Sequence, residues 1–139
     1  MINLILGRKG AGKTKKLIEL VNEAVEKSSG NVICVEKESL LTYNVNYRAR
    51  LIAADDYNVS GYDAFYGFLS GICAGDHDIT DVFVDATLRI GGRAYDDLSE
   101  FFSKVNVLSQ ITDINFTFTV SADKEELPSS AFVNCSVLN

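Results

Sequence analysis

The residues of this chain that are best suited to chemistry lie close to its start, between Gly7 and Thr14. Two glycines with four residues between them frame a short loop, and a lysine and a threonine directly follow the second glycine. Glycines let a backbone turn tightly and bring its N–H groups against phosphate oxygens. The lysine adds a positive charge, and the threonine hydroxyl is an oxygen ligand for Mg²⁺. We therefore expect the loop to bind the phosphates of a nucleotide through Gly7, Arg8, Lys9, Gly10, Ala11, Gly12, Lys13 and Thr14.

The segments on either side of this loop have the pattern that such a site needs. The apolar run at residues 1–6 predicts a buried strand. From Lys13 to Val25 apolar residues recur at helix spacing, and residues 28–30 are expected to end that helix, with Gly30 in a left-handed conformation. A phosphate-binding loop is expected between a strand and a helix, because the helix N-terminus adds its positive dipole end.

A candidate metal ligand lies in the middle of the chain, where Asp85 follows an apolar run. Residues 82–84 predict a buried strand, and an acid at the end of such a strand can hold the Mg²⁺ of a bound nucleotide. We expect Thr14 and Asp85 to bind the metal and Lys13 to contact the β- and γ-phosphates. The alternative is that Asp85 only ends a strand. Asp81, at the other end of this strand, is expected to be merely solvated.

Strands and helices alternate along the rest of the chain. A helix is expected behind a capping-box-like start at Ser60, closing at Gly75, and another around residues 98–108. Part of residues 36–50 is expected to be extended, because Tyr43, Val45 and Tyr47 alternate with polar residues. Further strands are expected at residues 32–35, 51–54, 114–120 and 132–138. The first strand–helix–strand unit predicts a parallel pair joined by a crossover helix. The whole pattern predicts an α/β fold, a three-layer sandwich with a mainly parallel sheet, formed by residues 1–139 as one domain.

Charge and cysteine content narrow the class of protein. The net charge of -6 argues against nucleic acid as a partner, since such binders neutralise phosphates with basic residues. Three cysteines, far apart and in apolar surroundings, predict buried free thiols rather than a disulfide framework. The apolar run at residues 2–6 is too short for a signal peptide or a membrane span. We expect a cytoplasmic protein without membrane contact.

Residues 1–27 and 79–86 resemble the P-loop NTPase superfamily, and the α/β order resembles a minimal RecA-like ATPase core. This resemblance implies a P-loop NTPase fold in which one more strand inserts between the P-loop strand and the strand that ends in Asp85. Residues 114–120 are the candidate for that strand. Thr119 or Ser121 would then contact the γ-phosphate or the attacking water, or their hydroxyls would only line the polar side of the strand.

One position departs from the pattern of many of these ATPases, which carry a catalytic glutamate directly after the metal-binding acid. Ala86 stands there in this chain. Some RecA-like enzymes instead place a glutamate at the end of the second strand, where this chain has Glu36 and Glu38. Our hypothesis is that one of these two polarises the attacking water, so that Lys13, Glu36 and Glu38 are the candidate catalytic residues. Without such a base the protein would bind ATP and hydrolyse it slowly or not at all.

Two other groups of side chains have alternative interpretations. Arg89 and Arg93 flank two glycines, and a mobile loop there could present an arginine to a phosphoryl group, but a flexible surface loop with solvated charges is the preferred interpretation. The tyrosines could stack on adenine, although such residues more often form core or partner surface. They are Tyr43, Tyr47, Tyr57, Tyr62 and Tyr66.

ATP is favoured over GTP because the sequence lacks the guanine-binding signals. Leu88 stands where a DxxG switch beginning at Asp85 would need glycine, and no [NT]-K-x-D motif follows the later strand. The leading expectation is a Mg-dependent ATPase of low intrinsic activity. One alternative is a nucleotide-dependent regulatory or assembly switch with a protein partner or further copies of itself. The other is a small-molecule kinase, for which residues 36–60 are the only sizeable insert.

Overall fold

The computed structural model describes residues 1–42 and 44–139. Within these residues six parallel strands form one sheet in the order β3-β2-β4-β5-β1-β6. The strands are β1 (Ile2–Leu6), β2 (Asn31–Glu36), β3 (Arg50–Ala53), β4 (Ile79–Asp85), β5 (Asn115–Val120) and β6 (Cys135–Val137). The α/β class and the parallel sheet expected from the sequence are therefore confirmed.

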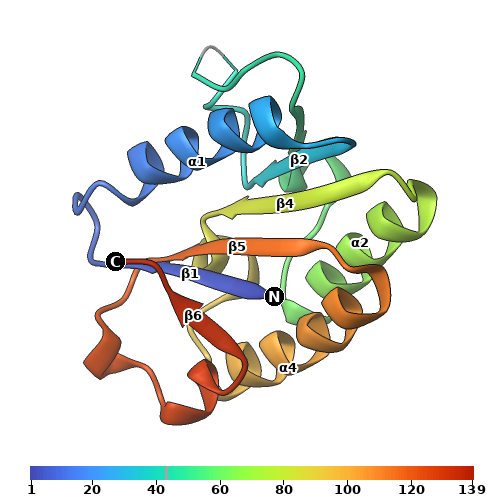
Figure 1. Ribbon diagram of the computed structural model, residues 1–139. Coiled ribbons are helices and arrows are strands. Elements are labelled where there is room, and N and C mark those ends of the chain that lie inside the picture. The colour runs from blue at the N-terminus through green and yellow to red at the C-terminus, as the bar shows by residue number, and fades with distance from the viewer. Residues whose placement is uncertain (43) are drawn as a thin grey trace.

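Helices cover both faces of this sheet (Figure 1). One face carries α1 (Lys13–Lys27), and the other carries α2 (Tyr62–Gly75) and α4 (Tyr95–Thr112). The short helix α3 (Thr87–Gly91) directly follows β4 and was not expected from the sequence. Single 3-10 turns occupy Ala54–Tyr57, Lys124–Glu126 and Ser129–Phe132. The result is the three-layer arrangement that the alternating pattern predicted.

The two faces are packed with different residues. Beneath α2 and α4 the core is aromatic, with the rings of Phe65 and Phe101 stacked 4.8 Å apart and Phe118 packed edge-on against Phe101 at 5.7 Å. Beneath α1 the core is smaller and mostly aliphatic, with Phe83 as its one buried aromatic residue among those described, and Leu17 and Val21 are fully buried there. Because both faces are covered, strands at the centre of the sheet are buried on both sides, as parallel sheets usually are.

The order of the strands agrees with two expectations and corrects a third. β5 lies between β4 and β1, the position that the resemblance implied for the additional strand. β1 and β2 are parallel and are joined through α1, but β4 and β5 lie between them, so the two strands are not direct neighbours. The carboxyl ends of β1, β2, β4 and β5 consequently meet at one edge of the sheet.

Two glycine positions differ from expectation. Gly30 does not adopt the left-handed conformation, and α1 ends on Ser28 in an extended conformation. A Cβ at Gly30 would lie 1.9 Å from the carbonyl oxygen of Asp78, so this glycine is required by close packing instead. The N-cap of α2 is Gly61, whose φ is 84°, and it caps without a side-chain bond, so Ser60 does not form the expected capping box.

The remaining differences lie at irregular segments. Val45 and Tyr47 lie in turns and bends rather than in an extended segment, and Tyr43 lies outside the described residues. The last strand is only three residues long, because a 3-10 turn follows Pro128 and delays its start. Cys34 and Cys73 are buried free thiols as expected, whereas Cys135 is half-buried. None of the helices in the described ranges is long and apolar enough to cross a membrane.

Candidate functional site

The loop between β1 and α1 is shaped by its glycines. Gly7, Gly10 and Gly12 have φ angles of 147°, 88° and 85°, a region that other residues rarely adopt. A Cβ on Gly7 would in addition lie 2.9 Å from the Cβ of Ala11. The loop is joined to the end of β5 by the N–H of Gly7, which donates to the carbonyl of Ala122 at 3.1 Å. The conformation of this loop therefore depends on its glycines and on its contact with the segment after β5.

Lys13 and Thr14 stand at the first turn of α1, directly behind the loop. The Lys13 ammonium crosses the loop and donates to the carbonyl of Arg8 at 2.9 Å. Burial lowers the pKa of Lys13, although the nearby Asp85 carboxylate acts in the opposite direction. The Thr14 hydroxyl donates to Asp85 Oδ2 at 3.2 Å. The fold therefore brings the two expected metal ligands together across 71 positions of sequence.

Asp85 is held in place by the neighbouring strand. The hydroxyl of Thr119, which is fully buried on β5, donates to Asp85 Oδ1 at 2.6 Å. Thr119 therefore orients the acid, and its hydroxyl does not simply fill the polar side of a strand. Ser121, the other hydroxyl considered, lies at the cleft described below, and its carbonyl accepts a bond from Arg93 at 3.2 Å.

Glu36 lies beside Asp85, because β2 and β4 are neighbours and these two residues are opposite in register. Its side chain is buried, and Oε1 accepts the backbone N–H groups of Leu40 at 2.7 Å and Leu41 at 3.2 Å. Burial is the main cause that raises the pKa of Glu36. The charges of Asp85 and Glu38 add to this effect, and the two N–H groups oppose it.

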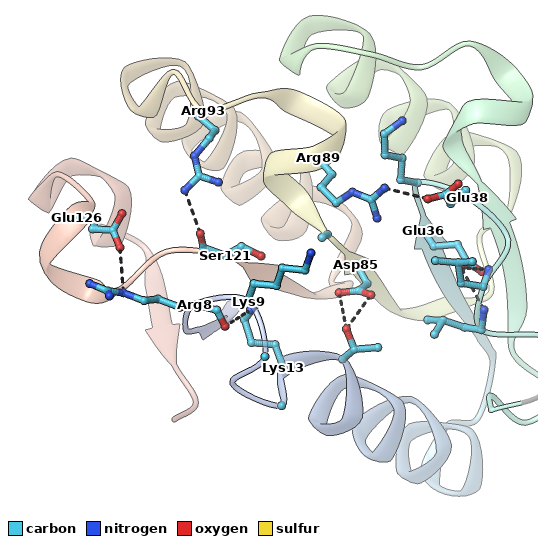
Figure 2. A pocket seen from close by; sticks show the side chains of 17 residues that line it. Arg8, Lys9, Lys13, Glu36, Glu38, Asp85, Arg89, Arg93, Ser121 and Glu126 are labelled. Carbon is cyan, nitrogen blue, oxygen red and sulfur yellow. Dashed lines mark hydrogen bonds and ion pairs between the residues drawn. The ribbon is translucent and has the colours of Figure 1, made fainter.

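The other expected acid, Glu38, is engaged with α3. Its Oε1 pairs with Arg89 Nη2 at 2.9 Å, and both side chains are about half exposed. Leu88 and Ile90, on either side of Arg89, are buried, so Arg89 is the outward-facing residue of this short helix. A contact between the segment after β2 and α3 is thereby made above the sheet edge (Figure 2).

The turn after α3 is more constrained than the sequence suggested. The Tyr62 hydroxyl donates to the carbonyl of Gly92 at 2.6 Å, and a Cβ at Gly91 would lie 2.1 Å from the Tyr62 ring. The turn is therefore packed against α2. Arg89 and Arg93 are exposed, as expected for solvated charges, but Arg89 lies on the short helix α3 rather than in a loop, and both side chains line the cleft.

The charged side chains described above border one cleft of about 1030 Å³, which is large enough for a small-molecule ligand. In a chain whose net charge is -6, the cleft wall carries six basic side chains against four acidic ones. The basic ones are Arg8, Lys9, Lys13, Lys37, Arg89 and Arg93. The acidic ones are Glu36, Glu38, Asp85 and Glu126. The local excess of positive charge suits an anionic ligand.

The expected site residues are almost all brought together here. Lys13, Thr14, Glu36, Glu38 and Asp85 line the cleft, as do the other loop positions except two that shape the loop from behind. Those two are Gly7 and Ala11.

Two acids that contact the loop, Asp123 and Glu126, were not expected from the sequence. Arg8 pairs with Asp123 at 2.6 Å and lies 4.0 Å from Glu126. The signal that could have found them is the Asp-x-x-Glu spacing, which forms a capping box around the turn after β5.

Comparison with known protein families and with curated proteins found no match to this chain. What the cleft binds must therefore be inferred from its geometry.

Proposed function

We propose that this chain binds Mg-ATP in the cleft and hydrolyses it slowly, as a P-loop NTPase of RecA-like strand order. The observation that carries the proposal is the meeting of Lys13, Thr14 and Asp85 at the carboxyl ends of β1 and β4. A lysine, a hydroxyl and a carboxylate around a glycine loop form the set of groups that holds a triphosphate and its magnesium. The position of β5 between β4 and β1 gives the proposal further support.

Each part of the loop has a defined task in binding. The backbone N–H groups of the glycine loop and the first turn of α1 face anionic oxygens. Lys13 exchanges its bond with the Arg8 carbonyl for phosphate oxygens, which are stronger acceptors because they are charged. Thr14 and Asp85 supply two hard oxygen ligands, and Mg²⁺ commonly takes the rest from phosphates and water. When bound, the metal would neutralise charge that builds up on the phosphates.

Glu36 is the residue we assign as the general base. Its Oε2 accepts no hydrogen bond within the described part of the chain, so one carboxylate oxygen is free for a water molecule. A raised pKa brings a carboxylate closer to the working pH, where it is a more effective proton acceptor. Glu36 takes the proton of the water, the water oxygen attacks the terminal phosphorus, and the bond to ADP breaks. Glu38 is less suited because it is already paired with Arg89.

Slow turnover is expected for a structural reason. The position after Asp85 is Ala86, which cannot accept a proton. The substitute base, Glu36, is held by two backbone N–H groups that fix it toward residues 40–41. If ATP is bound but never hydrolysed, the same geometry describes a nucleotide-dependent switch.

The first test is binding of ATP with Mg²⁺, measured by calorimetry for the wild type and for Lys13→Ala. Loss of a charged hydrogen-bonding group costs about 1.5–3 kcal/mol, so we expect affinity to fall by roughly 10- to 150-fold. Lys27→Ala is the matched control, because Lys27 stands at the other end of α1 and pairs with Glu23. Equal affinity for ATP in the wild type and Lys13→Ala would contradict the assignment of the glycine loop as the phosphate site.

The second test is release of phosphate from ATP, with Glu36→Gln and Glu38→Gln compared side by side. We expect Glu36→Gln to slow release by about 10²–10⁴-fold, the usual contribution of general-base catalysis, and Glu38→Gln to have the smaller effect. The reverse order would assign the base to Glu38. No release by the wild type with ATP bound would favour the switch.

A further inference from the structure

An ion pair joins α3 to the segment after β2 on the cleft wall that faces the glycine loop. Arg89 Nη2 lies 2.9 Å from Glu38 Oε1, with side-chain exposures of 52% and 51%. Arg89 belongs to α3, which follows Asp85, whereas Glu38 belongs to the segment after β2. No other hydrogen bond or ion pair of either side chain is made within residues 1–42 and 44–139, so most of the five guanidinium donors remain unused.

Arg89 lines the same cleft as the expected metal-binding acid, Asp85. Figure 2 shows Arg89 on the wall opposite the glycine loop, with the Asp85 carboxylate between the two. In such sites the metal bridges the β- and γ-phosphates, so the end of the triphosphate lies next to the metal-binding acid. Asp85 is that acid under the function proposed above, and α3 begins only two residues after it.

Lys9 and Lys13 belong to the glycine loop and the start of α1, on the facing wall, and the remaining cations of the cleft have partners other than Glu38. Arg8 is held by Asp123 at 2.6 Å, and Lys37 contacts both carboxylate oxygens of Asp55, at 2.9 and 3.0 Å. Arg93 donates to the carbonyl of Ser121, just after β5, at 3.2 Å and to the hydroxyl of Tyr95 at 3.3 Å. Among the described residues, Arg89 is paired with Glu38 alone, and Glu38 is an exposed side chain on the same cleft wall.

We propose that Arg89 is a ligand of the terminal phosphate, supplied by the chain itself, and that Glu38 holds it in place when no triphosphate is bound. The proposal rests on the function proposed above. An exposed ion pair contributes little to stability, so it is readily given up. A guanidinium binds phosphate through two parallel N–H bonds, which is a stronger contact than a single bond to one carboxylate oxygen.

The exchange has a defined consequence for selectivity. ADP lacks the terminal phosphate and leaves Arg89 on Glu38, whereas ATP draws Arg89 away. The contact between α3 and the segment after β2 is then broken only by the triphosphate. Glu38 competes with the phosphate for the same guanidinium. Removal of Arg89 must therefore weaken ATP binding, whereas removal of the Glu38 charge must strengthen it.

The test is a set of dissociation constants for Mg-ATP and Mg-ADP, measured by calorimetry on the wild type, Arg89→Ala, Glu38→Gln and the double variant. We expect Arg89→Ala to weaken ATP binding about tenfold and to leave ADP binding unchanged, because the charged contact to the terminal phosphate is lost and the loss of the exposed Glu38 pair offsets part of it. Glu38→Gln should strengthen ATP about two- to threefold, since it removes an exposed competing pair. The double variant should match Arg89→Ala, because Glu38 acts only through Arg89.

A matched control exists on another surface. Arg48 Nη2 lies 3.0 Å from Glu26 Oε1, with side-chain exposures of 51% and 68%, and neither residue lines the cleft. Arg48→Ala and Glu26→Gln should leave both dissociation constants unchanged. Thermal unfolding of each variant checks that the fold is kept.

The outcomes separate this proposal from the one on which it rests. If the wild type binds neither nucleotide, both proposals are overturned. If the wild type binds both but Arg89→Ala changes ATP and ADP equally or not at all, Arg89 is no ligand of the terminal phosphate and the nucleotide site stands. Weaker ATP binding in Glu38→Gln would likewise contradict the exchange.

Discussion

The two walls of the cleft are built in different ways. The wall formed by Gly7–Thr14 is one continuous stretch whose shape comes from three glycines with positive φ and from the helix behind it. The opposite wall combines residues 36–41, after β2, with α3 and the turn that follows it. Side chains hold that wall together, through Glu36 to the N–H groups of residues 40 and 41 and through Arg89 to Glu38.

This difference decides how sensitive the structure of each wall is to amino-acid substitutions. A loop built from backbone conformation keeps its shape as long as its glycines remain. A wall assembled from distant side chains depends on packing elsewhere, here on Tyr62 of α2, which holds Gly92 from outside the cleft. The opposite wall should therefore be sensitive to substitutions that never touch the ligand.

The largest expected effect on stability comes from Gly91→Ala. The new methyl group would lie 2.1 Å from the Tyr62 ring, and the ring is packed against Phe101 at 5.2 Å and cannot withdraw freely. Overpacking of this kind typically costs about 1–3 kcal/mol. We expect the free energy of unfolding, measured with a chemical denaturant, to fall by roughly 2 kcal/mol.

Gly67→Ala is the matched control for that experiment. Gly67 lies inside α2, and a Cβ there meets nothing within 4 Å. Alanine should stabilise this helix by about 0.5–1 kcal/mol, because it lowers the entropy of the unfolded chain and favours the helix. A Gly91→Ala variant as stable as the wild type would mean that Tyr62 does not fix the opposite wall.

A smaller effect is expected at the boundary between the walls, from Thr119→Val. Valine keeps the volume of the buried side chain but removes the hydroxyl that donates to Asp85 Oδ1 at 2.6 Å. Groups that orient a metal ligand commonly change metal affinity by about 10–100-fold, and we expect the lower end, near tenfold. The measurement is the Mg²⁺ concentration that half-saturates ATP binding.

Thr117→Val provides the comparison on the same strand. Thr117 is also buried on β5 and points to the same side, but it lies opposite Phe83 in register rather than at the sheet edge. Its replacement should leave the Mg²⁺ dependence unchanged. Equal shifts in both variants would trace the effect to β5 packing and not to the orientation of Asp85.

The same contrast explains what could be predicted from the sequence. The glycine loop was predicted residue by residue, because its spacing is local and its chemistry depends on backbone conformation. Asp85 was predicted because it ends an apolar run, and its meeting with Thr14 was expected because the loop after β1 and the end of β4 lie at the same edge of a parallel sheet.

The opposite wall was not predictable in the same way. Arg89 and Glu38 are 51 positions apart, and no local pattern says that they meet. Thr119 was considered for its hydroxyl, but its bond to Asp85 depends on β5 and β4 being neighbours, which only the strand order shows. Gly30 was assigned to a helix cap, because its close approach to Asp78 cannot be seen in a linear sequence.

The smallest expected effect concerns the charge of Glu36. It shows whether the buried carboxylate of the proposed base lowers the stability of the folded protein. Burial raises the pKa of Glu36 in the folded protein, so the unfolded chain gives up this proton at a lower pH than the folded chain. Stability is therefore lost as the pH rises from the ordinary range of a glutamate to the raised value, and the loss persists above it. Glutamine can still accept the N–H groups of Leu40 and Leu41 through its carbonyl oxygen, but it carries no charge to desolvate.

We accordingly expect Glu36→Gln to be slightly more stable than the wild type near pH 7, with the difference disappearing near pH 4, where both forms are neutral. Thermal unfolding at the two pH values measures this difference. Glu19→Gln, an exposed position on α1, corrects for the general effect of removing one negative charge from an acidic protein. A Glu36→Gln variant that is less stable at neutral pH would show that the charged carboxylate holds residues 40 and 41 more strongly than burial penalises it. The charged form of Glu36 would then stabilise the opposite wall in addition to accepting a proton.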